Sequence, residues 1–150
     1  MLVKSLFAYA HFIAAFGIAA TLFFEWITFS KTPTALDARR IAMADRWYGL
    51  FAGLLLVVGF IRAYSYEKGF EFYLASPFFH LKLTLFILIG LLSIYPTVRF
   101  MRWRPDIQAG RAPAVTDQQY TRISRLLGLQ MVLLALVLLS ASLMANGVRF

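Results

Sequence analysis

Residues 2–29 read LVKSLFAYAHFIAAFGIAATLFFEWITF, a nearly unbroken run of apolar side chains. A membrane-crossing helix needs about 20 predominantly apolar residues, so this run predicts one. Three further runs of sufficient length lie at about residues 41–64, 78–98 and 126–145. The chain is 61% hydrophobic, above the roughly 45–50% of soluble domains. The sequence therefore predicts an all-α fold, a four-helix transmembrane bundle that forms a single domain over residues 1–150.

Basic residues are unevenly divided between the two ends of this bundle. The chain has 15 Lys and Arg against 7 Asp and Glu. The larger basic group flanks the first and third connections and comprises Lys31, Arg39, Arg40, Arg99, Arg102, Arg104, Arg111, Arg122 and Arg125. The positive-inside rule assigns these connections to the cytoplasm and both termini to the outside. We therefore expect a multi-pass protein of a bacterial inner membrane, with the lipid bilayer rather than nucleic acid as its partner.

The only two histidines both lie inside apolar runs, His11 in the first and His80 in the third, within SPFFHLKLTLFILIGLL (76–92). An ionisable side chain within a membrane span marks a candidate functional site. With the termini outside, both imidazoles fall in the outer half of the membrane. Neutral imidazoles suit iron, and a chain without cysteine has no thiolate ligands. We predict that His11 and His80 are the axial ligands of a haem b iron; a structural role for both is the alternative.

Several side chains that can donate hydrogen bonds are expected in the outer half of the bundle, near the two histidines. Arg62 and Tyr64 end the second apolar run, Lys68 lies in the outer connection, and Lys82 follows His80 by two positions. Haem carries propionate groups, and carboxylates are held by Lys, Arg and Tyr donors. These residues are therefore candidate cofactor-binding residues, whereas ordinary interfacial placement of long polar side chains explains them equally well.

Acidic residues mark the opposite end of the first helix. Glu25 shares a helical face with His11 and lies about 21 Å deeper at 1.5 Å per residue. Asp45 and Arg46 enter the second helix from the same side. A charge near hydrocarbon needs a partner, so we predict an ion pair between Glu25 and Arg46. A proton or anion site near the inner surface is the alternative.

Two shorter signals concern helix geometry. Gly49 and Gly53 form a G-x-x-x-G pair that permits close contact between helices and makes a homodimer a candidate assembly. The pair Tyr95–Pro96 lies within the third apolar run. Proline removes a backbone donor and predicts a bend there.

Residues 45–104 resemble a bacterial family known only as predicted membrane proteins of unknown function, which implies a shared fold. A more distant likeness is to the HemJ-type protoporphyrinogen IX oxidases, four-helix membrane proteins that bind haem b. The likeness lies in His11 with the small residues Ala14, Ala15 and Gly17, and in an H-x-K-L element at residues 80–83. It implies His11 as a haem ligand, and His80 with Lys82 as ligand or essential residues, Lys82 being the catalytic candidate.

The chain departs from the HemJ pattern at two helix ends. Phe24–Glu25–Trp26 and Phe29–Ser30 stand where those enzymes have a Pro-Arg pair and a further histidine, and Tyr95–Pro96 stands where they have Tyr-His. The leading hypothesis is thus a haem b protein with a redox role, acting on a porphyrin or linked to a quinone. A non-enzymatic membrane subunit and a small proton-coupled carrier that uses Glu25, Asp45, Arg46 and Gln130 are the alternatives.

Overall fold

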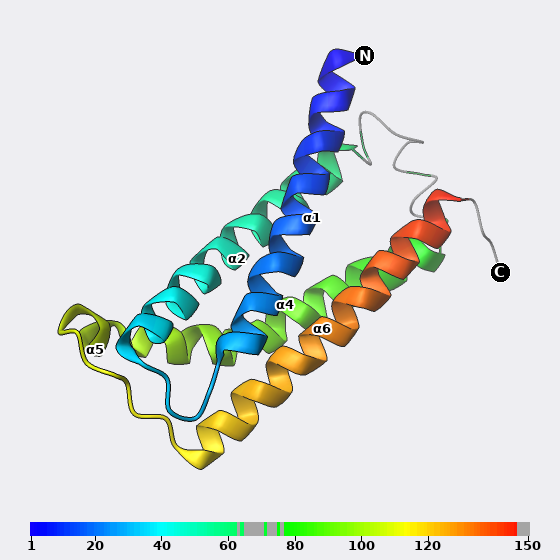
Figure 1. The fold of residues 1–150 in the computed structure, drawn as a ribbon. Helices are drawn as coiled ribbons and strands as arrows, with labels where there is room; N and C mark the ends of the chain where they lie inside the picture. Colours follow the sequence, from blue (N-terminus) through cyan, green and yellow to red (C-terminus); the bar gives the residue numbers. More distant parts are fainter. Residues whose placement is uncertain (63, 65–70, 72–74, 76, 147–150) are drawn as a thin grey trace.

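The computed structural model describes residues 1–62, 64, 71, 75 and 77–146. Its helices are α1 (Leu2–Thr28), α2 (Ala35–Ile61), α4 (Pro77–Arg102), the short α5 (Arg104–Gln108) and α6 (Asp117–Ala145), as Figure 1 shows. Within the described ranges, four helices are long and apolar enough to cross a membrane. The predicted all-α fold of four membrane-spanning helices is confirmed.

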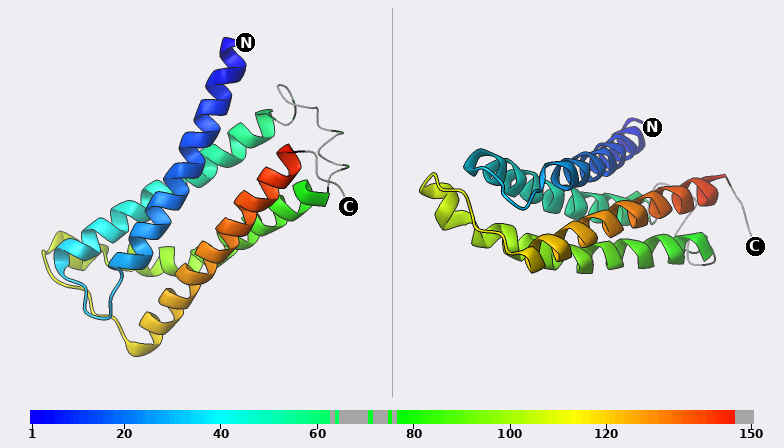
Figure 2. Two further views of the ribbon diagram at one scale, coloured as in Figure 1. Left: turned by 45° about the vertical axis from the view of Figure 1, so that its right-hand side comes forward. Right: turned by 60° about the horizontal axis from the view of Figure 1, so that its bottom comes forward.

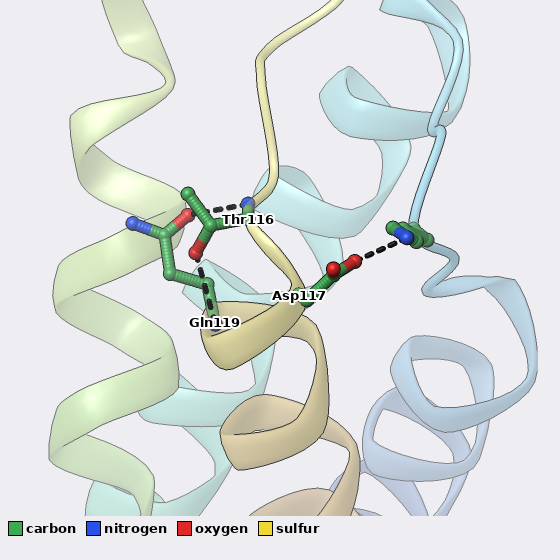
Figure 3. Close-up of polar contacts among 4 residues, drawn as sticks. Thr116, Asp117 and Gln119 are labelled. Carbon is green, nitrogen blue, oxygen red and sulfur yellow. Dashed lines mark hydrogen bonds and ion pairs between the residues drawn. The ribbon is translucent and has the colours of Figure 1, made fainter.

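Two helices begin well before the predicted apolar runs, because each starts at a polar cap. Thr34 precedes α2, and its side chain accepts a hydrogen bond from the backbone N–H of Asp37 at 3.1 Å. Thr116 precedes α6 and forms a capping box with Gln119, with bonds of 3.1 and 3.3 Å (Figure 3). Such caps satisfy backbone donors that the first helical turn leaves open. Apolar length locates the part of a helix that lies in lipid, whereas the cap locates its first residue.

Helix α4 passes through Pro96 and ends at Arg102 rather than at residue 98. A proline inside a helix removes one backbone hydrogen bond and favours a change of direction. Figure 1 shows the final turns of α4 leaving the direction of the rest of the helix before α5 begins. The predicted bend is present.

The spanning helices form two hairpins. Helix α1 packs along α2, and α4 packs along α6, whereas the hairpins meet through fewer contacts, from α1 to α6 and from α2 to α4. Among the described residues, the backbones of α1 and α4 do not approach each other closely. Figure 2 shows the two hairpins as separate layers that cross. Between 17% and 28% of each apolar window is buried inside the chain, so most apolar side chains face outward, where a bilayer would contact them.

Small residues bring α1 and α2 together. Ala14 is fully buried, and a Cβ atom added at Gly17 would lie 2.5 Å from the ring of Phe51 on α2. Only glycine fits such a contact without displacement of the ring. In contrast, Gly49 and Gly53 are exposed, and a Cβ atom at either meets nothing within 4 Å among the described atoms. This G-x-x-x-G pair makes no close contact within the described chain, and the homodimer stays a prediction.

An aromatic cluster closes the end of the bundle at which α1 meets α2 and α6 begins. The ring of Phe29 stacks on Trp103 at 6.2 Å and on Tyr120 at 5.7 Å between centroids, and Phe100 lies beside both Phe29 and Trp103. An ion pair between Lys31 and Asp117 joins the same connections (Figure 3). We call this the loop end, and the opposite end, which holds both histidines, the histidine end.

Candidate functional site

Polar side chains from all four spanning helices meet inside the loop-end half of the bundle. Glu25 of α1 and Gln130 of α6 are each 1% exposed, and Asp45 of α2 is 7% exposed. Tyr48 of α2 is also buried, and Thr97 of α4 completes the group. We call these five residues the carboxyl cluster. Buried polar groups are costly unless they bond to one another, so their meeting point is a candidate site.

Two hydrogen bonds of the cluster cross between the hairpins. The hydroxyl of Thr97 donates to Oδ1 of Asp45 at 3.1 Å, which joins α4 to α2. The hydroxyl of Tyr48 donates to Oε1 of Gln130 at 2.9 Å, which joins α2 to α6. The carboxyl cluster therefore lies at the interface between the two helical hairpins.

The carboxyl groups of Glu25 and Asp45 lie close enough to interact with each other. No basic side chain in the described part of the chain forms an ion pair with either. Two carboxylates that meet in an apolar interior cannot both be ionised, because each disfavours the charge of the other. Burial and mutual repulsion therefore favour a state in which at least one of the two carboxyl groups is protonated.

The predicted ion pair between Glu25 and Arg46 is wrong. Arg46 is exposed, and Asp45, one position earlier, takes the inward place beside Glu25. Successive residues of a helix are rotated by about 100°, so one position decides which side chain faces the core. The outward position lets the long arginine side chain extend toward the headgroups at the membrane surface, whereas the carboxyl group can be buried once it is protonated.

Two buried atoms of the cluster have no hydrogen-bond partner among the described residues: Oε1 of Glu25, an acceptor, and Nε2 of Gln130, a donor. Leaving such an atom unpaired costs about 1–3 kcal/mol. An occupant that donates to Glu25 and accepts from Gln130 would complete the bonding of the cluster. A water molecule or a small polar solute has both capacities.

The histidine end has a different geometry. His11 is half-buried on α1, and its ring lies against α2, where a Cβ atom added at Gly59 would be 3.5 Å from Cε1. His80 is exposed in the first turn of α4. The two imidazoles thus belong to different hairpins, on helices whose backbones do not approach each other closely in the described ranges. Ligation of a haem iron by both stays a prediction.

The predicted propionate donors differ in how far they are buried. Arg62 is half-buried, with its guanidinium carbon 5.9 Å from the centroid of the Phe12 ring. Lys82 is half-buried and close enough to Arg62 for their charges to repel. Tyr64 is exposed, and Lys68 lies outside the described residues. No three His, Asp or Glu side chains gather as metal ligands anywhere in the described ranges, so the metal hypothesis depends on the two histidines.

Sequence reasoning named Glu25, Asp45 and Gln130 but missed Tyr48 and Thr97. A usable signal was present for Tyr48, because it lies three positions after Asp45 and so on the same helical face. Thr97 carried no such signal, since its partner is on another helix and the bend at Pro96 sets its direction.

Four spanning helices around an internal polar cluster define a multi-pass membrane protein. The chain belongs to the family described as predicted membrane protein (DUF2214), whose family model matches residues 3–149. The resemblance to a family of unknown function, predicted over residues 45–104, is confirmed and extends over nearly the whole chain. No curated protein and no solved structure matches. The HemJ likeness stays a prediction.

Proposed function

We propose that this protein is a small proton-coupled membrane carrier and that the carboxyl cluster is its proton-binding site. The observation that supports this function is the side-by-side arrangement of Glu25 and Asp45, both buried and both without an ion-pair partner among the described residues. A carboxyl pair of this kind gains or loses a proton when its access to water changes. Intramembrane carboxyl groups that line a bundle interior serve as proton relays in pumps and transporters.

The position of the cluster supports the same function. In many carriers, substrate and coupling ions bind at the interface between two helical units that move against each other. Here Glu25 and Asp45 belong to the first hairpin, whereas Thr97 and Gln130 belong to the second. Movement of one hairpin against the other would break both bonds that cross the interface and open the cluster to water. Release of the proton would then be coupled to that movement.

The test uses wild-type protein in liposomes adsorbed on a solid-supported membrane. A pH jump should produce a transient charge movement as the carboxyl pair exchanges its proton with the medium. Infrared difference spectra of the same samples should contain the C=O band of a protonated carboxylic acid. Glu25→Gln and Asp45→Asn should each abolish the charge movement and remove or shift this band.

Asp37→Asn is the matched control, because Asp37 lies in the first turn of the same helix as Asp45 and outside the cluster. This variant should keep both signals. Wild-type signals that persist in Glu25→Gln and in Asp45→Asn, or folded wild-type protein without either signal, would overturn the proposal and leave the cluster as a structural clamp between hairpins.

Haem b binding with a redox role on a porphyrin or a quinone is the second candidate function. It is supported by the closeness of two half-buried cations, Arg62 and Lys82, at the end of the bundle that holds both histidines. His11 and His80 would hold the iron, and the two cations would receive propionate groups. Bound haem would supply one-electron chemistry at this end.

We also propose that the membrane is the inner membrane of a bacterium and that the loop end is cytoplasmic, since most basic residues flank that end. A reporter that is active only outside the cytoplasm, fused after Phe150, should then be active. The same reporter placed at Ala109, after α5, should be silent. The reverse pattern would place the carboxyl cluster in the outer half of the membrane.

A further inference from the structure

Two arginines from different helices lie beside one aromatic ring at the loop end. The guanidinium carbon of Arg99 on α4 is 5.2 Å from the ring centroid of Tyr95, and that of Arg122 on α6 is 5.9 Å from the same centroid. Arg99 and Tyr95 are half-buried, whereas Arg122 is exposed. We call Arg99 and Arg122 the arginine pair. A ring face attracts each cation, but the two guanidinium groups repel each other.

No carboxylate in the described part of the chain neutralises the arginine pair. At the loop end, Asp106 forms an ion pair with Arg111, and Asp117 forms one with Lys31. Glu25 and Asp45 face each other inside the bundle. Two cations held beside one ring without a counter-charge form a place where an external anion gains energy from both.

The arginine pair lies near the ends of its two helices, at the depth expected for lipid headgroups. Arg99 lies three positions before the end of α4, and Arg122 lies five positions after the start of α6. At 1.5 Å per residue, both are within about 8 Å of their helix ends. If these helices cross a bilayer, this is the level at which hydrocarbon gives way to phosphate groups.

An apolar path leads from the pair toward the middle of the bundle. Leu91 lies one helical turn before Tyr95 on the same face, and Leu129 lies two turns after Arg122. Both leucines are exposed, at 59% and 45%. A charged site that continues into exposed apolar side chains fits a ligand with an anionic head and a hydrocarbon tail.

We propose that the arginine pair, together with Tyr95, binds the headgroup phosphate of an anionic phospholipid, whose acyl chain lies along the α4–α6 hairpin. Planar guanidinium groups bind phosphate through two parallel N–H···O bonds, which a single ammonium cannot reproduce. The negative charge of the phosphate offsets part of the repulsion between the two arginines, and the lipid joins α4 to α6 at the loop end. This site is separate from the carboxyl cluster and does not depend on proton transport.

The experiment measures lipid binding to detergent-purified full-length protein by native mass spectrometry and by thermal unfolding. Phosphatidylglycerol should form a specific adduct and raise the unfolding temperature, whereas phosphatidylcholine and inorganic phosphate should do neither. Arg99→Gln and Arg122→Gln should each weaken the apparent affinity by about tenfold, as expected for the loss of one charge-assisted bond. Arg104→Gln is the matched control, because Arg104 is an exposed arginine at the same end, on α5.

Arg122→Gln keeps the test decisive if Arg99→Gln fails to fold, since Arg122 is exposed and its replacement leaves the packing intact. Arg122→Lys should bind less well than wild type because it keeps the charge but loses the planar donor fork. Unchanged phosphatidylglycerol binding in Arg122→Gln, or an equal loss in Arg104→Gln, would overturn the proposal. Stabilisation by inorganic phosphate alone would overturn the assignment to a lipid.

Discussion

The loop end and the histidine end both contain polar side chains within apolar helices. Among the described residues, the polar side chains that meet from all four spanning helices lie at the loop end. Glu25, Asp45 and Gln130 are buried, and the cluster they form is bonded across the hairpin interface. At the other end, His80 is exposed, and the backbone of its helix does not approach that of the His11 helix closely in the described ranges. The histidines are candidate site residues because the sequence has only two of them. The carboxyl cluster is a candidate site because its side chains are buried and bond to one another.

The difference has an energetic cause. An imidazole can be neutral, so a histidine near a membrane surface needs little from its neighbours. A carboxyl group in the interior needs a proton and a bonding partner, which only neighbouring helices can supply. Acidic residues inside a small bundle therefore constrain the arrangement of the helices more strongly than histidines do.

The largest expected effect is the loss of a haem absorbance band in histidine variants. Such a result would make the histidine end a redox site and would overturn the contrast between the two ends. If His11 and His80 ligate haem b, protein reconstituted with haem should show a Soret band that His11→Ala and His80→Ala each abolish. Lys82→Ala should keep the band and weaken haem retention. Absorbance spectra of folded protein in detergent measure this, and a wild-type protein that accepts no haem would remove the redox candidate.

A smaller effect concerns packing in the hairpin that holds the acidic pair. Gly17→Ala should lower the free energy of unfolding by about 1–3 kcal/mol, because the added Cβ meets the Phe51 ring and overpacks the contact between α1 and α2. Gly53→Ala is the control, since a Cβ there meets nothing within 4 Å in the described chain. It should be neutral or stabilising by up to about 1 kcal/mol.

Equilibrium unfolding in mixed micelles measures both glycine variants. Equal destabilisation at Gly17 and Gly53 would mean that Gly53 also packs against a neighbour, such as a second copy of the chain. That result would support the homodimer predicted from the G-x-x-x-G pair.

The smallest expected effect is a coupling free energy, measured with two double-mutant cycles that test which side chain neighbours Glu25 at the loop end. Glu25→Gln and Asp45→Asn should be coupled by at least about 0.5 kcal/mol, because the two side chains are in contact. Glu25→Gln and Arg46→Gln should add to within about 0.5 kcal/mol, because Arg46 faces outward. Strong coupling to Arg46 with additivity at Asp45 would contradict the observed geometry.

The sequence predicted the number and type of helices because lipid requires long apolar runs, and these can be counted directly. It predicted the starts of α2 and α6 poorly, because Thr34 and Thr116 cap helices whose first turns are polar. It placed Glu25 and Asp45 at similar depth but chose the wrong partner for Glu25. Depth follows from residue number, whereas the inward direction of a helix follows from packing against its neighbours.

The contact between Thr97 and Asp45 lies next to Pro96, the proline inside α4. Because Pro96 has no N–H group, the helix lacks a hydrogen bond to the carbonyl of Leu92, and its ladder is weakest at this turn. The direction of the last turns of α4 therefore depends on contacts with other parts of the chain, namely the bond from Thr97 to Asp45 and the packing of Phe100 and Trp103 against Phe29. A change in the protonation of Asp45 would alter its hydrogen bond with Thr97. The residues of α4 after Pro96, including Arg99, would then change direction, because the helix bends most easily at this proline.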